Sequence, residues 1–160
     1  MMLDDLVAVL TAGAAVVFLA AGATMIVRGV LGRRAVGAEL AAQRIRFPAA
    51  DALPADLARH AGSPVRTGGQ ARAYSAVIAA NLAKATDGRT YSEIAADCTG
   101  GGHGDERLTR LRETAFTGQS LRGALLGAYQ AWQVSLLVVG LGALFAVLGA
   151  VLLLVSLRGW

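Results

Sequence analysis

A chain of 160 residues with a formal net charge of +4 is long enough for one domain. Two uncharged apolar runs, residues 6–27 and 134–157, occupy almost a third of it, so the roughly 100 residues left for water are too few for a fully independent enzyme core. The 15 basic residues are scattered among 11 acids without the one-sided stripe of a phosphate-binding face, which argues against a nucleic-acid-binding protein. Nearly all of the bases are arginines, and together with heavy Ala, Gly, Val and Leu usage this is typical of a high-GC, actinobacterial genome.

Residues 6–27 predict a transmembrane helix, since about 20 apolar residues are enough to cross the hydrocarbon core of a bilayer. The run is preceded by Asp4 and Asp5 and by no base, whereas a secretory signal begins with a positively charged region, so we expect an anchor and not a cleaved leader. Five arginines follow it: Arg28, Arg33, Arg34, Arg44 and Arg46. Bases near a membrane segment are retained in the cytoplasm, which predicts a cytoplasmic middle segment and both termini outside.

The first part of this middle segment predicts a helical continuation and then a short turn. The sequence after the membrane run contains good helix formers, so the helix is expected to continue to Phe47, where Pro48 ends it. A short helical turn is expected over Ala55 to His60, closed by Gly62.

Two capping boxes then predict two helices. In each, a threonine hydroxyl and a Gln or Glu side chain exchange hydrogen bonds with backbone amides, at Thr67–Gln70 and at Thr90–Glu93. The first helix is expected to end at Asp87–Gly88 and the second at Asp97. Apolar residues recur along the first helix at a spacing of three or four: Tyr74, Val77, Ile78 and Leu82. This stripe either packs against Leu108, Leu111 and the extended membrane helices, or faces another protein.

Glycines dominate the sequence that follows. Residues 99–104 contain four of them and predict a mobile loop. Asp105 is expected to cap a further helix, which Gly118 interrupts, and from Ser120 the chain is expected to be helical into the second apolar run.

The second run predicts a second transmembrane helix with aromatic residues at its ends. Trp132 and Trp160 bracket it, and 28 residues at a rise of about 1.5 Å give about 42 Å, the thickness of a bilayer with its headgroups. Tyr129 lies beside the first indole, and Arg28, Arg33 and Arg34 can meet anionic lipid at the inner surface. The alternative is that these aromatic residues are ordinary packing residues.

Both runs carry small residues at helical spacing. They form the ladder Gly142, Ala146, Ala150 and the shorter ladder Ala8, Ala12. Small side chains let helix backbones approach closely in lipid, so the ladders are expected to pack the two helices on each other or dock them on other subunits. The alternative is that Ala and Gly are simply abundant in this sequence.

Few residues suggest chemistry. Cys98 and His103 are metal-ligand types, but a tetrahedral site needs four ligands, and a glycine-rich loop is a poor rigid cage. The glycine cluster lacks the Lys followed by Ser or Thr of a phosphate loop. We therefore predict no catalytic residue, no metal site, no cofactor and no small-molecule substrate.

The expected fold is an all-α membrane protein, a hairpin of two transmembrane helices joined by a cytoplasmic helical insert in the bacterial plasma membrane. The predicted parts are a short acidic N-terminus (1–5), the first transmembrane helix (6–27), the insert with its glycine loop at 99–104 (28–132), the second transmembrane helix (133–157) and an interfacial tail (158–160).

Three functions are compatible with this organisation. The first is a non-catalytic accessory, assembly or stabilising subunit of a larger membrane complex, whose partners are the bilayer and polytopic membrane proteins or further copies of the chain. The second is a membrane-tethered adaptor that recruits a soluble partner. The third is a membrane-surface enzyme or metal site around Cys98 and His103. The absence of ionisable groups from both apolar runs favours the first.

Overall fold

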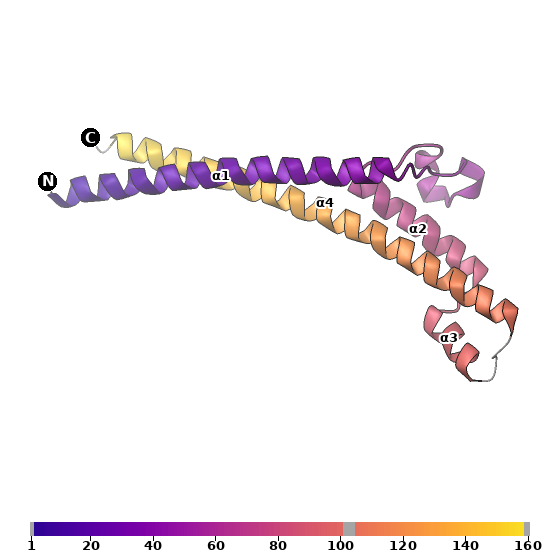
Figure 1. Cartoon of the computed structure of the whole chain (residues 1–160). Coiled ribbons are helices and arrows are strands. Elements are labelled where there is room, and N and C mark those ends of the chain that lie inside the picture. Colours follow the sequence, from indigo (N-terminus) through magenta and orange to yellow (C-terminus); the bar gives the residue numbers. More distant parts are fainter. Residues whose placement is uncertain (1, 101–104, 159–160) are drawn as a thin grey trace. The chain divides into compact units, whose positions relative to one another are not determined.

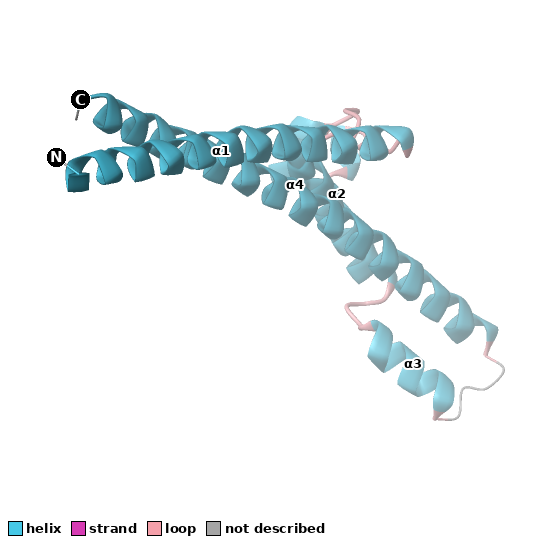
Figure 2. Cartoon of the chain, turned by 60° about the vertical axis from the view of Figure 1, so that its left-hand side comes forward, coloured by secondary structure: helices cyan, strands magenta, loops and turns pink. Residues whose placement is uncertain are grey.

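The computed structural model describes residues 2–100 and 105–158, with side chains from residue 6 onward. Every regular element in this described part is helical, as predicted (Figures 1 and 2). The elements are α1 (Met2–Ala42), the 3-10 helices η1 (Ala50–Ala52) and η2 (Ala55–His60), α2 (Gly68–Ala85), α3 (Tyr91–Thr99) and α4 (Glu106–Arg158). The chain divides into a helix-pair unit, Met1–Ala35 with Ala131–Trp160, and an insert unit, Val36–Gln130.

In the helix-pair unit, α1 and α4 run antiparallel side by side, with the two chain ends at the same end of the pair (Figures 1 and 2). Both helices are long and apolar enough to cross a membrane. In each, only 11% of the most apolar window is buried within the structure. Most of the aliphatic side chains of this unit therefore face outward.

Small residues at every seventh position form the contact between the two helices. They are Ala15, Gly22 and Gly29 on α1, and Ser135, Gly142, Gly149 and Ser156 on α4. A Cβ added to Gly22 would lie 2.6 Å from the Gly142 carbonyl oxygen, and one added to Gly149 would lie 2.9 Å from that of Ala15. The backbones are thus in direct contact, with large side chains such as Phe18 and Phe145 meeting edge to face beside them at 5.4 Å.

The insert unit has its own hydrophobic core. Eight buried residues make it: Leu40, Phe47, Leu53, Leu57, Val65, Ala71, Val77 and Leu125. They come from α1, η2, α2, α4 and the connecting segments that hold Phe47, Leu53 and Val65, so the core joins segments distant in sequence. Ile94 of α3 and Ala115 of α4 are also fully buried.

The two predicted capping boxes are both present and start their helices where expected. Thr67 accepts a hydrogen bond from the Gln70 amide and Thr90 accepts one from the Glu93 amide, each at 3.3 Å, and the Gln and Glu side chains return the bond. Asp87 and Gly88 both have a positive φ, 53° and 77°, after the end of α2. These local signals were sufficient because a cap involves only residues a few positions apart.

The first long helix ends earlier than predicted. α1 stops at Ala42 and not at Phe47, because Arg44 adopts a left-handed conformation with φ 53°. Phe47 instead donates its amide to the Ser63 carbonyl at 3.0 Å and is buried in the core. An isolated antiparallel bridge between Arg46 and Pro64 holds the two extended segments together.

Gly118 does not interrupt a helix, contrary to the prediction, and α4 is continuous through it. A Cβ at Gly118 would lie 3.0 Å from a methyl group of Leu82. The glycine therefore makes room for α2 against α4, and the cost of a glycine within a helix, about 0.5–1 kcal/mol, is offset by this packing.

The predicted loop at residues 99–104 is described only at its start. α3 extends to Thr99, two residues beyond the predicted end at Asp97, and Gly100 caps it. The rest of the loop lies outside the described residues.

Candidate functional site

The insert unit contains an open groove between α2 and α4, with a volume of about 620 Å³. We call it the groove and define it by its lining: Ile78, Asn81, Leu82, Ala85, Arg110, Glu113, Thr114, Thr117, Gly118 and Leu121. The lining combines aliphatic side chains with hydroxyl, amide and charged groups. Apolar grooves with polar groups beside them are one kind of surface on which proteins bind an amphipathic helix.

The structure divides the predicted apolar stripe of α2 between the core and the groove. Val77 is buried, and the ring of Tyr74 meets that of Phe47 edge to face at 5.2 Å. Ile78 packs against the core and also lines the groove, and Leu82 lies on Gly118 and lines the groove. The buried part of the stripe packs in the core with Leu40 of α1 and Leu125 of α4. Parts of Ile78 and Leu82 remain on the groove, and a partner on this surface stays a prediction.

The α4 side of the groove was missed by sequence reasoning. Leu121 is 53% exposed, although its side chain is aliphatic. Two charged residues of α4, Arg110 and Glu113, belong to the lining. Arg110 forms an ion pair with Glu106, one turn earlier, at 3.4 Å. An exposed pair at this spacing contributes only about 0.3–0.5 kcal/mol, so the charges of Arg110 and Glu113 remain available to a partner. The sequence signal for this side of the groove is Gly118 with Leu121 three residues later. The glycine was interpreted as a helix break, so the two residues were not placed on one helix face.

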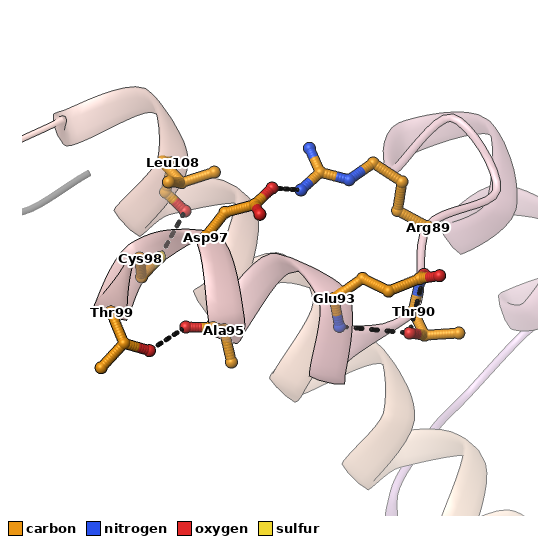
Figure 3. A network of polar contacts seen from close by, with 8 residues as sticks. All are labelled: Arg89, Thr90, Glu93, Ala95, Asp97, Cys98, Thr99 and Leu108. Atoms are coloured by element: carbon orange, nitrogen blue, oxygen red, sulfur yellow. Dashed lines mark hydrogen bonds and ion pairs between the residues drawn. The ribbon is translucent and has the colours of Figure 1, made fainter. Parts of the chain in front are cut away.

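Cys98 lies at the end of α3, where a small polar network surrounds that helix (Figure 3). Arg89 forms an ion pair with Asp97, and the Cys98 sulfur is 3.9 Å from the Leu108 carbonyl oxygen. The thiol is half-buried. His103 lies outside the described residues. Within the described part, no three His, Cys, Asp or Glu side chains are grouped as metal ligands.

Acidification is expected to loosen α3 at its beginning. The Thr90 amide, and then the Thr90 hydroxyl, donate hydrogen bonds to the Glu93 carboxylate and lower the pKa of Glu93, with Arg89 adding to the effect (Figure 3). Because the folded-state pKa lies below the unfolded value, this cap stabilises α3 fully above the unfolded pKa. The stabilisation is lost as pH falls through the folded-state pKa.

Hydrogen exchange of the Thr90 amide, followed from neutral pH to below about 4, measures this loss. The cap of α2 is a control within the same chain, because its side chain is the uncharged Gln70. We expect protection to fall at Thr90 and to persist at Thr67. Equal loss at both caps would show that the insert unfolds as a whole.

Two of the predicted interface aromatic residues, Trp132 and Tyr129, contact arginines. The Arg33 guanidinium lies over the Trp132 ring, 4.8 Å from its centroid. In the insert unit, Arg72 donates a hydrogen bond to the Tyr129 hydroxyl at 3.2 Å and lies over that ring. Arg28 and Arg34 are exposed. Trp160 lies outside the described residues.

The predicted small-residue ladders lie partly in the helix contact. Gly142 is buried, Ala146 is half-buried with its backbone against Gly22, and Ala150 is exposed. Gly149 occupies the contact in place of Ala150, because the contact repeats every seven residues and not every four. Ala8 and Ala12 are half-buried.

Hydroxyl groups in the helix-pair unit are satisfied within their own helix. Each donates to a backbone carbonyl three or four residues earlier, at 2.7–2.8 Å: Thr11, Thr24, Ser135 and Ser156. A hydroxyl bonded in this way does not need water or another helix as a partner.

Comparison with known proteins gives no relative: no protein family, no curated protein sequence and no solved structure matches this chain.

Proposed function

We propose that the helix-pair unit spans a membrane as a hairpin. The observation that supports this is the distribution of side-chain size: glycine, alanine and serine occupy the contact, and leucine and valine point outward. A soluble helix pair has the opposite arrangement, with large apolar residues in the seam and polar residues outside. The outward residues include Val16, Val17, Leu137 and Leu144, each more than half exposed. Lipid is the solvent that such a surface requires.

We place the insert in the cytoplasm and both termini outside. Arg28, Arg33 and Arg34 follow the first apolar run closely, within the distance over which basic residues determine orientation. Only one base, Arg158, follows the second run.

The function that we propose is that of a non-catalytic accessory or assembly subunit of a larger bacterial membrane complex. The groove of the insert unit is the single observation that supports it, because the aliphatic side chains in its lining, Ile78, Leu82 and Leu121, are costly to leave in water. From the sequence, the small-residue ladders could pack the two helices on each other or dock them on other subunits. Because Gly142 and Ala146 lie in the contact between α1 and α4, partners would instead dock on the outward aliphatic surface and on the groove.

Purification from native membranes in mild detergent tests this proposal. We expect polytopic membrane proteins to co-purify in fixed proportion, and Leu121→Asn to reduce their recovery about tenfold or more, as for a central contact residue. Phe116→Asn is the matched control, since Phe116 is 59% exposed on the same helix but does not line the groove. Purification as a solitary monomer, or equal recovery from both variants, would contradict the proposal.

The same groove supports a second candidate function, that of a membrane-tethered adaptor for a soluble protein. An amphipathic helix from a soluble partner would fit it equally well. The purification distinguishes the two functions: a soluble protein in fixed proportion supports the adaptor, and membrane proteins support the subunit. A further copy of the chain as the only partner would indicate a homo-oligomer.

A further inference from the structure

A second, smaller pocket lies where α1 ends, entirely within the insert unit. Its volume is about 170 Å³. Six residues line it: Ala41, Arg44, Arg46, Pro64, Val65 and Arg66. Three of the six are arginines and none is acidic. We call it the arginine pocket.

Backbone hydrogen bonds fix the two segments that carry these arginines. The Phe47 amide donates to the Ser63 carbonyl and the Val65 amide donates to the Ile45 carbonyl, both at 3.0 Å. These bonds flank the bridge between Arg46 and Pro64. Phe47 and Val65 are buried in the core beneath. The pocket is therefore built on ordered backbone, although its arginine side chains are exposed.

The other two arginines are also held at their backbones. The Arg66 amide donates to the Gln70 side-chain oxygen at 2.9 Å, as part of the cap that starts α2. The Arg44 amide donates to the Ala41 carbonyl at 3.1 Å while its φ is 53°. Glycine or asparagine adopts this left-handed conformation after a helix with less strain than arginine does. The strain of this conformation has to be offset by the surrounding structure.

The three guanidinium groups are not neutralised by carboxylates. The ion pairs of the described part are Arg89 with Asp97 and Arg110 with Glu106, and neither belongs to the pocket. Arg46 donates to the Gly62 carbonyl at 3.3 Å, which leaves most of its five N–H groups free to bind a ligand. Three like charges around one pocket repel each other, and an anion between them removes that repulsion.

We propose that the arginine pocket binds a phosphate-type oxyanion. The planar guanidinium forms paired hydrogen bonds with phosphate oxygens, and the three arginines that line this pocket can supply several such donors to a tetrahedral anion. At about 30 Å³ per water molecule, the pocket has room for such an anion with part of its hydration shell. The phosphate group can belong to a free ion or to a lipid headgroup. This inference does not depend on the accessory-subunit role.

The test uses the full chain in phosphatidylcholine nanodiscs, with NMR detection of the arginine side-chain N–H signals. Inorganic phosphate is titrated in one arm, and in the other phosphatidic acid replaces part of the lipid in phosphate-free buffer. We expect saturable shifts at Arg44, Arg46 and Arg66. Saturation by phosphate alone identifies a free ion, and shifts with phosphatidic acid alone identify a headgroup. Unsaturable or equal shifts at all arginines in both arms would overturn the proposal.

Two variants give a readout that a merely structural role would not produce. Arg44→Asn relieves the left-handed strain, so we expect its thermal midpoint without phosphate to be equal to or above that of the native chain. Phosphate is expected to raise the thermal midpoint of the native chain. From this effect, the apparent phosphate affinity is expected to be at least tenfold weaker in Arg44→Asn and in Arg66→Gln than in the native chain. Arg112→Gln, outside the pocket, is the control and should bind phosphate normally. Undiminished phosphate affinity in both pocket variants would overturn the proposal.

Discussion

Replacing Gly142 with leucine is expected to separate α1 from α4, whereas the same replacement at Gly140 is expected to leave them paired. A Cβ at Gly142 would lie 2.8 Å from the Gly22 carbonyl oxygen and 2.9 Å from the Ile26 amide nitrogen. Backbone atoms cannot rotate away as a flexible side chain can, so the overpacking should cost about 3 kcal/mol or more. Gly140, two residues earlier on the same helix, has no atom within 4 Å of the position of an added Cβ.

Electron-electron distance measurements between two spin labels follow this separation. The labels are placed at Val16 and Val147, which are exposed on α1 and α4, in a chain whose own cysteine is removed by Cys98→Ser. We expect a narrow distance distribution in the starting chain and in Gly140→Leu, and a broad or longer one in Gly142→Leu. A narrow, unchanged distribution in Gly142→Leu would mean that the glycine contact does not hold the pair together.

Truncation of Phe47 to alanine is expected to destabilise the insert unit strongly. Only 3% of Phe47 is exposed, and its ring lies 5.0 Å from that of His60 and 5.2 Å from that of Tyr74. Removing a buried phenylalanine typically costs about 3–5 kcal/mol, through lost burial and the cavity that remains. Such a loss is a large fraction of the stability of a small domain.

Hydrogen exchange of the α2 amides measures this effect in the intact chain. We expect Phe47→Ala to reduce protection along α2 by roughly 100-fold or more. Phe116→Ala serves as the control, because that ring is mostly exposed and, among the aromatic residues that the structure describes, contacts only the Tyr91 ring, at 5.9 Å. Its effect should stay below about 1 kcal/mol. Similar protection in the two variants would contradict the assigned core.

Local features of the fold could be predicted from the sequence. The two capping boxes, Thr67 with Gln70 and Thr90 with Glu93, each form hydrogen bonds within four residues of sequence. Both helices therefore begin where the sequence predicts. The two apolar runs likewise give two long helices, because length and hydropathy are properties of the run itself.

Features that depend on a distant partner could not be predicted. Gly118 has the pattern of a helix break until Leu82 of another helix is placed against it. The ladder Gly142, Ala146, Ala150 follows from the spacing within one helix. The small residues of α1 repeat every seven residues, however, so Gly149 and not Ala150 lies against them. The arginine pocket combines Arg44 and Arg66, which are brought together by the bridge between Arg46 and Pro64. No sequence period indicates that pairing.

Labelling with a membrane-impermeant maleimide shows whether the helix pair spans the membrane with the insert in the cytoplasm. Three single cysteines are introduced in the Cys98→Ser chain: Leu3→Cys before the first run, Ser92→Cys at an exposed position of α3, and Val147→Cys on the outward face of α4. We expect Leu3→Cys to react in intact cells, Ser92→Cys only after the membrane is permeabilised, and Val147→Cys in neither condition. Labelling of Ser92→Cys in intact cells would reverse the orientation, and labelling of Val147→Cys would show that the outward aliphatic face lies in water.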